Sequence, residues 1–298
     1  MLLSMDIMKV RDWTYLEDPP QDIGPARHLL EVYSKIPYHD LDDHIRRVVS
    51  PAPNGTGASA AELTRPALHQ REKAWCISQY PCVGRWKFLY ILDPQDPRYQ
   101  QVLFRLNVAG SRDVLLDLGC GVGQVIRQFR ADGTRGSQLI GTDLQSKFID
   151  IGYDLFQDRS TLGATFVAGD MLDPDDKQLA SLRGKVTIVH AGSFFHLFNW
   201  VQQLYMGKRL VEFIKPGTRN ALIYGRQVGS NNPGASMNSA RSAYLHDQAS
   251  FQRLWDEVGA LTGTRWQVQL EATGEPASKL PGFNHNTFPV NFTIYQVS

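Results

Sequence analysis

The chain has 298 residues, of which 42% are hydrophobic and 20% are charged, as in an ordinary globular protein with a substantial core. Its formal net charge of +1 gives no electrostatic reason to expect a nucleic acid or an anionic membrane as a partner. No apolar run approaches the ~20 residues that span a bilayer and no signal peptide is visible, so we expect a cytoplasmic protein without a membrane span.

Residues 1–110 show no repeated alternation of strands and helices. Residues 40–49 have the apolar spacing of a helix, and we expect further helices over residues 66–77 and 98–107. An apolar segment at residues 86–92 lies between the last two. The three cysteines of the chain are too few and too scattered for a disulfide framework or a metal site. This part of the sequence therefore predicts a mainly helical N-terminal cap.

From residue 111 to residue 298 strands and helices alternate, which predicts an α/β domain with a doubly wound sheet. We expect helices over residues 146–157 and 200–214. A further helix is expected to have Ser250 as its N-cap and to close near Gly263. Seven strands are predicted, at residues 114–117, 138–143, 165–170, 185–190, 220–225, 266–270 and 291–297.

The first of these strands ends at Asp117 and runs into a glycine-rich turn. Glycines at 119, 121 and 123 allow a sharp turn and let a ligand approach the backbone, and Gln124 begins a helix with free N–H groups. The Gly-x-Gly-x-Gly spacing differs from the Gly-x-Gly-x-x-Gly of dinucleotide-binding proteins, which disfavours a nicotinamide oxidoreductase. An acid followed by such a turn resembles the S-adenosylmethionine (SAM) site of class I methyltransferases.

Carboxylates also stand at the ends of the next two predicted strands. Asp143 can accept hydrogen bonds from both ribose hydroxyls of a nucleoside, and Asp170 can accept one from the exocyclic amine of adenine. Met171 can pack on the adenine ring. Asp117 can hold the methionine ammonium, with the turn at Gly119 and Gly121 and with Gln124 nearby. Each acid alone could be a solvated strand end, whereas the ordered set of three favours a nucleoside site.

Residues for a methyl acceptor follow the fourth and fifth predicted strands. His196 is the candidate for a catalytic group, although a histidine between aromatic residues is more often structural. His190 is expected to line the SAM pocket, through its backbone or its side chain. Arg226 and Gln227 can pair with a carboxylate and orient it, or can be surface groups. Aromatic residues are expected either to wall an apolar acceptor site or to pack in the core, among them Phe195 and Trp86.

Blocks along nearly the whole chain resemble the fungal meroterpenoid methyltransferases, among them LDLGCGVGQVIRQF, GYDLF, AGSFFHLFNW, YGRQVG and SFQRLWDEVGALTGTRW. That family methylates a carboxyl group on farnesylated polyketide intermediates and is homodimeric. The resemblance therefore implies a class I methyltransferase fold, SAM as cofactor, a hydrophobic carboxylic acid as substrate and a homodimer. It also implies SAM contacts, at Gln124, Asp143, Leu144, Asp170 and Met171.

Two alternatives remain open from the sequence. A carboxylic acid with a pKa near ~4 is already ionised at neutral pH, whereas a phenol with a pKa near ~10 needs a base. If the acceptor is a phenol or an enol, His196 is the candidate base. The chain could also be a non-methylating SAM-fold binding protein or a cyclase.

Overall fold

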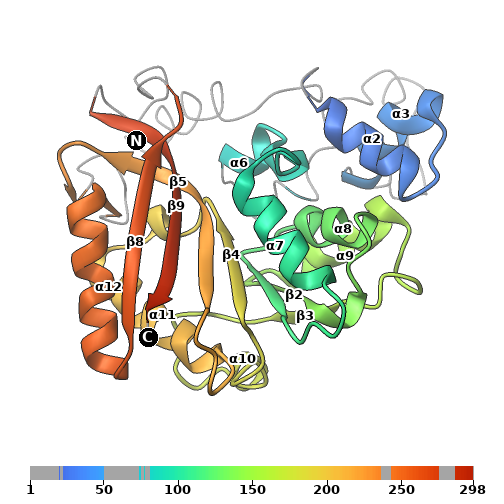
Figure 1. The fold of residues 1–298 in the computed structure, drawn as a ribbon. Helices are drawn as coiled ribbons and strands as arrows, with labels where there is room; N and C mark the ends of the chain where they lie inside the picture. Colours follow the sequence, from blue (N-terminus) through green and yellow to red (C-terminus); the bar gives the residue numbers. More distant parts are fainter. Residues whose placement is uncertain are drawn as a thin grey trace. The chain divides into compact units, whose positions relative to one another are not determined.

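The computed structural model describes residues 20, 23–49, 74, 77, 81–235, 243–274 and 286–297 (Figure 1). The predicted helix over residues 66–77 lies almost entirely outside this part of the chain. The chain divides into two compact units, each made of several segments. Unit 1 comprises Met1–Pro94, Gly121–Gly133 and Gln145–Gly163, and unit 2 comprises Gln95–Cys120, Thr134–Leu144 and Ala164–Ser298. The sequence-based boundary at residue 110 divides the chain differently and stays a prediction.

Unit 2 contains the predicted seven-stranded sheet, with the order β3-β2-β1-β4-β5-β9-β8. Strands β1 to β5 run parallel to one another, and β9 is antiparallel to β5 and to β8. The order reverses between β1 and β4, because the chain moves outward from β1 to β3 and then returns. The strands are β1 Leu115–Leu118, β2 Leu139–Asp143, β3 Thr165–Ala168, β4 Ile188–Gly192, β5 Leu222–Ser230, β8 Arg265–Ala272 and β9 Thr287–Val297.

Strands β5 and β9 are longer than their apolar runs predict. They pair along the whole of β5, from Leu222 opposite Tyr295 to Ser230 opposite Thr287. Backbone hydrogen bonds between the two strands satisfy the polar groups of both, so the pairing continues beyond the predicted end at residue 225.

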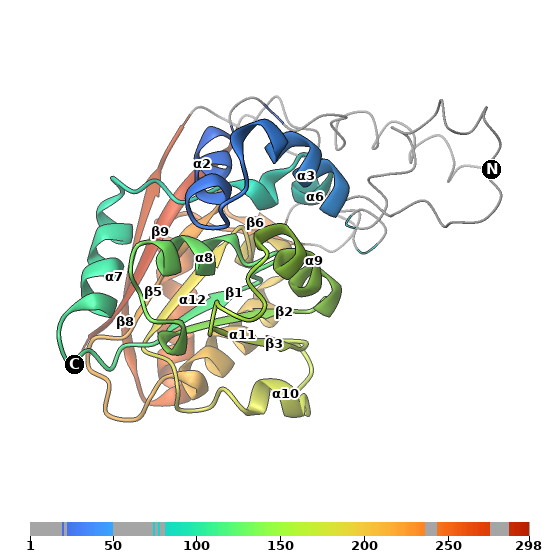
Figure 2. The same cartoon turned by 90° about the vertical axis from the view of Figure 1, so that its right-hand side faces the viewer.

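Helices cover the sheet of unit 2 (Figures 1 and 2). Helix α7 (Pro97–Asn107) confirms the expectation for residues 98–107, and α11 (Trp200–Phe213) confirms that for 200–214. The apolar sides of α11 and α12 (Gln248–Thr262) form the main core together with buried residues of all seven strands. The smaller elements of unit 2 are η3 Gly136–Gln138, α10 Lys177–Ala180, η4 Phe195–Leu197, β6 Gly234–Ala235 and β7 Tyr244–Leu245.

The start of α12 (Gln248–Thr262) corrects one prediction. Its N-cap is Asp247, not Ser250, because the Asp247 carboxylate accepts a hydrogen bond from the Ser250 N–H at 2.7 Å. The Ser250 hydroxyl in turn accepts from the Asp247 N–H at 3.1 Å, which completes a capping box. The predicted end is confirmed, since Gly263 has a φ of 67° as the left-handed C-cap.

The described residues of unit 1 form helices around a second, smaller core. Helices α3 and α9 confirm the predictions for residues 40–49 and 146–157. Leu30, Ile45 and Leu155 are completely buried in this core, and the His44 Nε2 lies 2.7 Å from the Leu155 carbonyl oxygen. The elements are α2 Gly24–Val32, η1 Tyr38–Asp40, α3 Leu41–Val49, α6 Pro81–Gly84, η2 Lys87–Leu89, α8 Gln124–Ala131 and α9 Ser146–Phe156. In neither unit do the described residues include a helix that is long and apolar enough to cross a membrane.

Candidate functional site

The carboxyl ends of strands β1 to β5 meet at one edge of the sheet in unit 2. Asp117 pairs in register with His190, Asp143 with Ala168, and Gly192 with Arg226. The structure thus brings together at this edge the polar residues that the sequence placed at separate strand ends. In open α/β sheets ligands bind at this edge, where the strand order reverses.

Asp117 and His190 form a buried pair directly across the reversal between β1 and β4. The Asp117 Oδ1 lies 2.7 Å from the His190 Nδ1, and both side chains are almost completely buried. The Asp117 Oδ2 is buried too and has no hydrogen-bond partner among the described residues. A buried carboxylate oxygen of this kind needs a donor, and the ammonium group of SAM fits that requirement. At this strand end the His190 side chain, and not only its backbone, thus contacts Asp117.

Two neighbours shape the surroundings of this pair. The Tyr224 ring lies 5.1 Å from the His190 ring, centroid to centroid. Burial first, and then the charge of Asp117, raise the pKa of Tyr224 well above its ordinary value, so its hydroxyl stays protonated. At Gly192 a Cβ would lie 3.0 Å from the His190 Cε1. Any larger residue at position 192 would therefore press against the imidazole.

The loop after β3 holds Asp170 and Met171 in a fixed conformation. One Asp170 oxygen accepts from the Leu172 N–H at 2.8 Å, and the Asp170 N–H donates to Asp176 at 2.8 Å. Arg209 of α11 donates to the carbonyl oxygens of Asp170 and Met171 at 3.1 and 3.2 Å, and also to that of Asp173. The other Asp170 oxygen makes no hydrogen bond within the described residues. Sequence reasoning missed Arg209, because a charged residue on an amphipathic helix is normally assigned to solvent.

Asp143 and Leu144 lie at the end of β2. The Asp143 carbonyl oxygen accepts from the Gly169 N–H at 3.0 Å, which joins this strand end to the loop after β3. The Leu144 side chain is 59% exposed, so a bound nucleoside that covered it would bury apolar surface. Both positions suit the predicted nucleoside contacts.

The segment after β4 makes a strained turn beside the glycine-rich stretch. Ser193 has a φ of 56°, which is uncommon for a residue with a side chain, and its N–H donates to the Arg226 carbonyl oxygen at 2.7 Å. The turn directs Phe194 onto Gly119, where a Cβ would lie 2.8 Å from the Phe194 ring. Gly119 is therefore required both for this contact and for its own φ of 68°. His196 follows in η4 and is half-buried.

Two predicted substrate residues are core residues in the structure. Phe195 is completely buried and packs against Phe251 at 6.0 Å and Phe292 at 5.9 Å between ring centroids. Trp86 is 3% exposed in the core of unit 1. Phe195 belongs to the main core, and the ring of its neighbour Phe194 packs against it at 6.0 Å between centroids while staying partly exposed. We do not retain either residue in the acceptor site.

The other predicted substrate residues lie on β5. Arg226 is exposed in the middle of β5, opposite Gly192 at the end of β4. Gln227 is 4% exposed, and neither atom of its amide has a hydrogen-bond partner among the described residues. The position of Arg226 suits contact with a charged acceptor.

Two predicted cofactor residues, Gly121 and Gln124, belong to unit 1. Gly121 and Gly123 have φ values of 55° and 68°, and α8 begins immediately after them at Gln124. The Gln124 side-chain oxygen is buried and has no hydrogen-bond partner among the described residues. A polar ligand group at the start of α8 would satisfy it.

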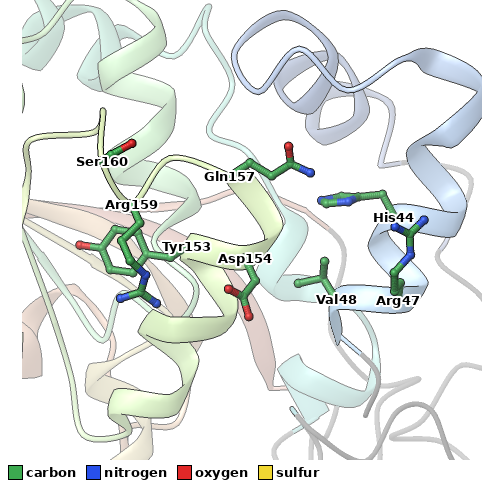
Figure 3. Close-up of a pocket in the computed structure, with 8 residues that line it drawn as sticks. All are labelled: His44, Arg47, Val48, Tyr153, Asp154, Gln157, Arg159 and Ser160. Atoms are coloured by element: carbon green, nitrogen blue, oxygen red, sulfur yellow. The ribbon is translucent and has the colours of Figure 1, made fainter. Parts of the chain in front are cut away.

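Unit 1 also has an open pocket of about 640 Å³ between α3 and the end of α9 (Figure 3). At the edge of this pocket the Arg159 guanidinium lies 4.3 Å from the centre of the Tyr153 ring. None of the predicted site residues lines this pocket, and we assign it no role. In the described parts of both units no group of three side chains is suited to hold a metal ion. The pocket is lined by His44, Arg47, Val48, Tyr153, Asp154, Gln157, Arg159 and Ser160.

Comparison with known proteins identifies the family. Residues 115–217 match the family model described as "Methyltransferase domain". The chain is 36% identical to the O-methyltransferase phiE of a fungal species, over 87% of this chain and 78% of that protein. The chain belongs to the fungal O-methyltransferase family.

Two further relatives support the family assignment. The O-methyltransferase atr3 of Stereocaulon alpinum is 35% identical over 84% of this chain and 66% of that protein. The Asnovolin E/Chermesin D methyltransferase nvfJ of Aspergillus novofumigatus is 32% identical over 82% of this chain and 80% of that protein. The methyltransferase uses SAM, as the strand-end carboxylates and the family together indicate.

Proposed function

We propose that this methyltransferase esterifies the carboxyl group of an apolar meroterpenoid, a farnesylated polyketide acid, in fungal secondary metabolism. The observation that carries the proposal is the segment after β4. Apart from the buried Phe195, residues 193–200 contain three partly buried aromatic side chains, Phe194, Phe198 and Trp200, and a single titratable group, His196. Such a segment suits an apolar acceptor whose reacting oxygen is ionised before it binds. The names of the relatives support O-methylation in fungi.

The strand ends of unit 2 supply the proposed cofactor contacts. The free Asp117 oxygen receives the ammonium group, and His190 holds the carboxylate in place. Asp143 receives the ribose hydroxyls, and Asp170 and Met171 contact the adenine. In unit 1 we assign the start of α8, with Gly121 and Gln124, to the same cofactor. The proposed acceptor residues are Phe194, Phe198, His196, Arg226 and Gln227.

SAM supplies an electrophilic methyl group. As the new bond between this carbon and the acceptor oxygen forms, the bond to sulfur breaks and its electron pair stays on sulfur. A carboxylate needs no base, so the protein contributes mainly placement, which can supply roughly 7–11 kcal/mol. In this proposal Arg226 orients the carboxylate through charge-assisted hydrogen bonds, and Phe194 and Phe198 exclude water.

Incubation of candidate terpenoid acids with methyl-labelled SAM tests the proposal. We expect a labelled methyl ester from the acid, and no product from the same skeleton with a carboxamide in place of the acid. A labelled methyl ether from a phenolic analogue would replace the carboxyl proposal by the phenol or enol alternative. SAM binding without transfer to any acceptor would favour a binding protein or a cyclase.

The substitution His196→Gln separates the carboxyl and phenol mechanisms. With a carboxylate acceptor we expect a modest loss in the single-turnover rate that does not vary between pH 6 and 9. With a phenol, loss of the base should cost roughly 10²–10⁴-fold, and the remaining rate should rise with pH. The matched control is His39→Gln, because His39 is exposed. A large loss that high pH rescues is the result that would rule out the carboxylate reading.

We also propose a homodimer, which the family resemblance supports. Sedimentation equilibrium should give twice the chain mass of 33.5 kDa, which is about 67 kDa. A mass of one chain at micromolar concentration would contradict the dimer without affecting the proposed reaction.

A further inference from the structure

Arg127 of α8 is completely buried in unit 1, where it binds the turn that precedes its own helix. Its Nη1 donates to the carbonyl oxygens of Val122 at 2.7 Å and Gly123 at 3.2 Å. An arginine at this depth must satisfy its donors within the protein. Two of its hydrogen bonds therefore fix two successive peptide groups of the glycine-rich turn.

The direction of these two carbonyl groups decides where the turn presents its donors. In a trans peptide group the C=O and the N–H point in opposite directions. With the Val122 and Gly123 carbonyls held toward Arg127, the N–H groups of Gly123 and Gln124 point away from it. Both N–H groups lie at the start of α8, where no intrahelical acceptor exists. They are the donors that a helix N-terminus offers to an anion.

Arg127 is itself held by Asp158 of the loop after α9, and Asp158 in turn contacts Tyr33 of the N-terminal segment. Its Nε and Nη2 donate to the two oxygens of Asp158, both at 2.9 Å, in a bidentate pair. The Tyr33 hydroxyl donates to the same carboxylate at 2.8 Å. Tyr33 is the C-cap residue of α2, so the N-terminal segment contacts the group that positions the arginine.

Helix α9 restrains the turn from a second direction. A Cβ at Gly152 would lie 2.1 Å from the Val122 carbonyl oxygen and 3.2 Å from the Arg127 Nη1. Real Cβ atoms do not approach so closely, so the turn can occupy this place only beside a glycine. The Val122 peptide is thus enclosed between Arg127 and α9.

We propose that Arg127, Asp158 and Tyr33 are positioning residues that orient the N–H groups at the start of α8 for the carboxylate of the methionine part of SAM. The inference rests on the proposed assignment of this helix start to SAM. It gives Tyr33 of the N-terminal segment a part in cofactor binding.

The test compares two ligands that differ only in the amino acid part. S-adenosylhomocysteine carries the carboxylate, whereas 5′-methylthioadenosine lacks it and keeps the nucleoside. Isothermal titration calorimetry is performed with the wild type, with Tyr33→Phe and with Arg127→Lys. The control is Tyr38→Phe, which changes an exposed tyrosine of the same segment.

We expect Tyr33→Phe to weaken S-adenosylhomocysteine binding about two- to fivefold and to leave 5′-methylthioadenosine binding unchanged, as should the control for both ligands. Arg127→Lys should show the same selectivity with a larger loss. Equal weakening of both ligands, or no weakening of either by Tyr33→Phe, would overturn the inference even if Arg127→Lys fails to fold. Absence of wild-type binding to S-adenosylhomocysteine would instead contradict the cofactor assignment itself.

Discussion

At the scale of single residues, the carboxylates of Asp117 and Asp170 each bond to the protein through one oxygen and leave the other for a ligand. One oxygen of Asp117 bonds to His190, and one oxygen of Asp170 bonds to the Leu172 N–H. In each case the second oxygen makes no hydrogen bond to a described residue. A side chain that is fixed through one oxygen loses little conformational freedom when a ligand binds the other.

We predict that Asp143→Ala weakens SAM binding at least tenfold without unfolding the protein. Loss of charge-assisted hydrogen bonds to the ribose hydroxyls should cost roughly 1.5–3 kcal/mol. Calorimetric titration with SAM measures the effect, and circular dichroism checks the fold. Asp175→Ala is the matched control, because Asp175 is exposed in the loop after β3. Unchanged affinity in the folded Asp143 variant would place the ribose elsewhere.

Much of the candidate site was predictable at this scale, because acids directly after apolar runs identify strand ends. The partners of these residues were not. The Asp117–His190 pair joins residues that are 73 positions apart, and it exists only because β1 lies beside β4. The buried positions of Arg127 and Arg209 were missed for a related reason: a helical pattern shows which face is polar, but not that an arginine binds backbone carbonyls.

At the scale of secondary-structure elements, α12 depends on its capping box. Burial tends to raise the pKa of Asp247, but the hydrogen bonds from the hydroxyl and N–H of Ser250 outweigh it and hold the pKa below its ordinary value. The cap therefore contributes fully above pH ~3.9, and its contribution is lost as the pH falls through the lowered pKa.

We predict that Asp247→Ala lowers the unfolding free energy by about 1 kcal/mol at pH 7 and by less below pH 4. Urea denaturation at both pH values measures the change. Asp256→Ala removes an exposed carboxylate from the same helix and should cost less at pH 7. Equal losses of unfolding free energy in the two variants would show that the capping box does not stabilise α12 more than an ordinary surface carboxylate does.

His246 joins α11, α12 and the segment after β4. Its ring nitrogens lie 3.1 Å from the Ser250 hydroxyl and 3.1 Å from the Gln203 Oε1. Gln203 in turn donates to the carbonyl oxygens of Phe198 at 2.8 Å and Tyr244 at 3.0 Å. Burial is the main cause that lowers the pKa of His246 to about 4, with Arg253 also lowering it and Asp247 opposing. The imidazole is therefore neutral in the folded protein at neutral pH.

From the lowered pKa of His246 we predict that the folded protein loses stability in mild acid. The unfolded chain takes up the proton near pH 6.5 and the folded chain only near 4, so stability is complete above 6.5 and declines as the pH falls toward 4. The lowering of the pKa corresponds to about 3 kcal/mol of unfolding free energy. Urea denaturation between pH 4 and 7 should show this decline in the wild type and a smaller one in His246→Gln. The same slope in both proteins would exclude His246 as its source.

At the scale of the whole molecule, the fold class followed from the alternation of apolar runs and helical segments. The sequence predicted seven strands and their approximate places, but not their order, because pairing across the sheet leaves no local signal. It also placed all of residues 1–110 in one extension. In the structure, α8 and α9 share a compact unit with residues of that stretch, through contacts that no local pattern encodes.

A ligand that binds the folded chain alone must raise its stability. We predict that SAM and S-adenosylhomocysteine raise the thermal unfolding midpoint and that NADH and NADPH do not. At a ligand concentration of about 100 times the dissociation constant the gain should be about 2.7 kcal/mol. Differential scanning fluorimetry over a ligand series measures it. A comparable shift of the unfolding midpoint with a nicotinamide cofactor would contradict the inference that the glycine spacing disfavours a nicotinamide oxidoreductase.

The close contact at Gly152 predicts which substitutions this position would tolerate. In the middle of a helix alanine is favoured over glycine by about 1 kcal/mol, so intrinsic propensity alone ranks Gly152→Ala among the beneficial changes in a saturation mutagenesis library. The Val122 carbonyl oxygen at 2.1 Å from any Cβ reverses that ranking. A screen of this library for methyl transfer should therefore return only glycine at position 152. Position 152 should then tolerate substitution as little as the glycine-rich turn that it contacts.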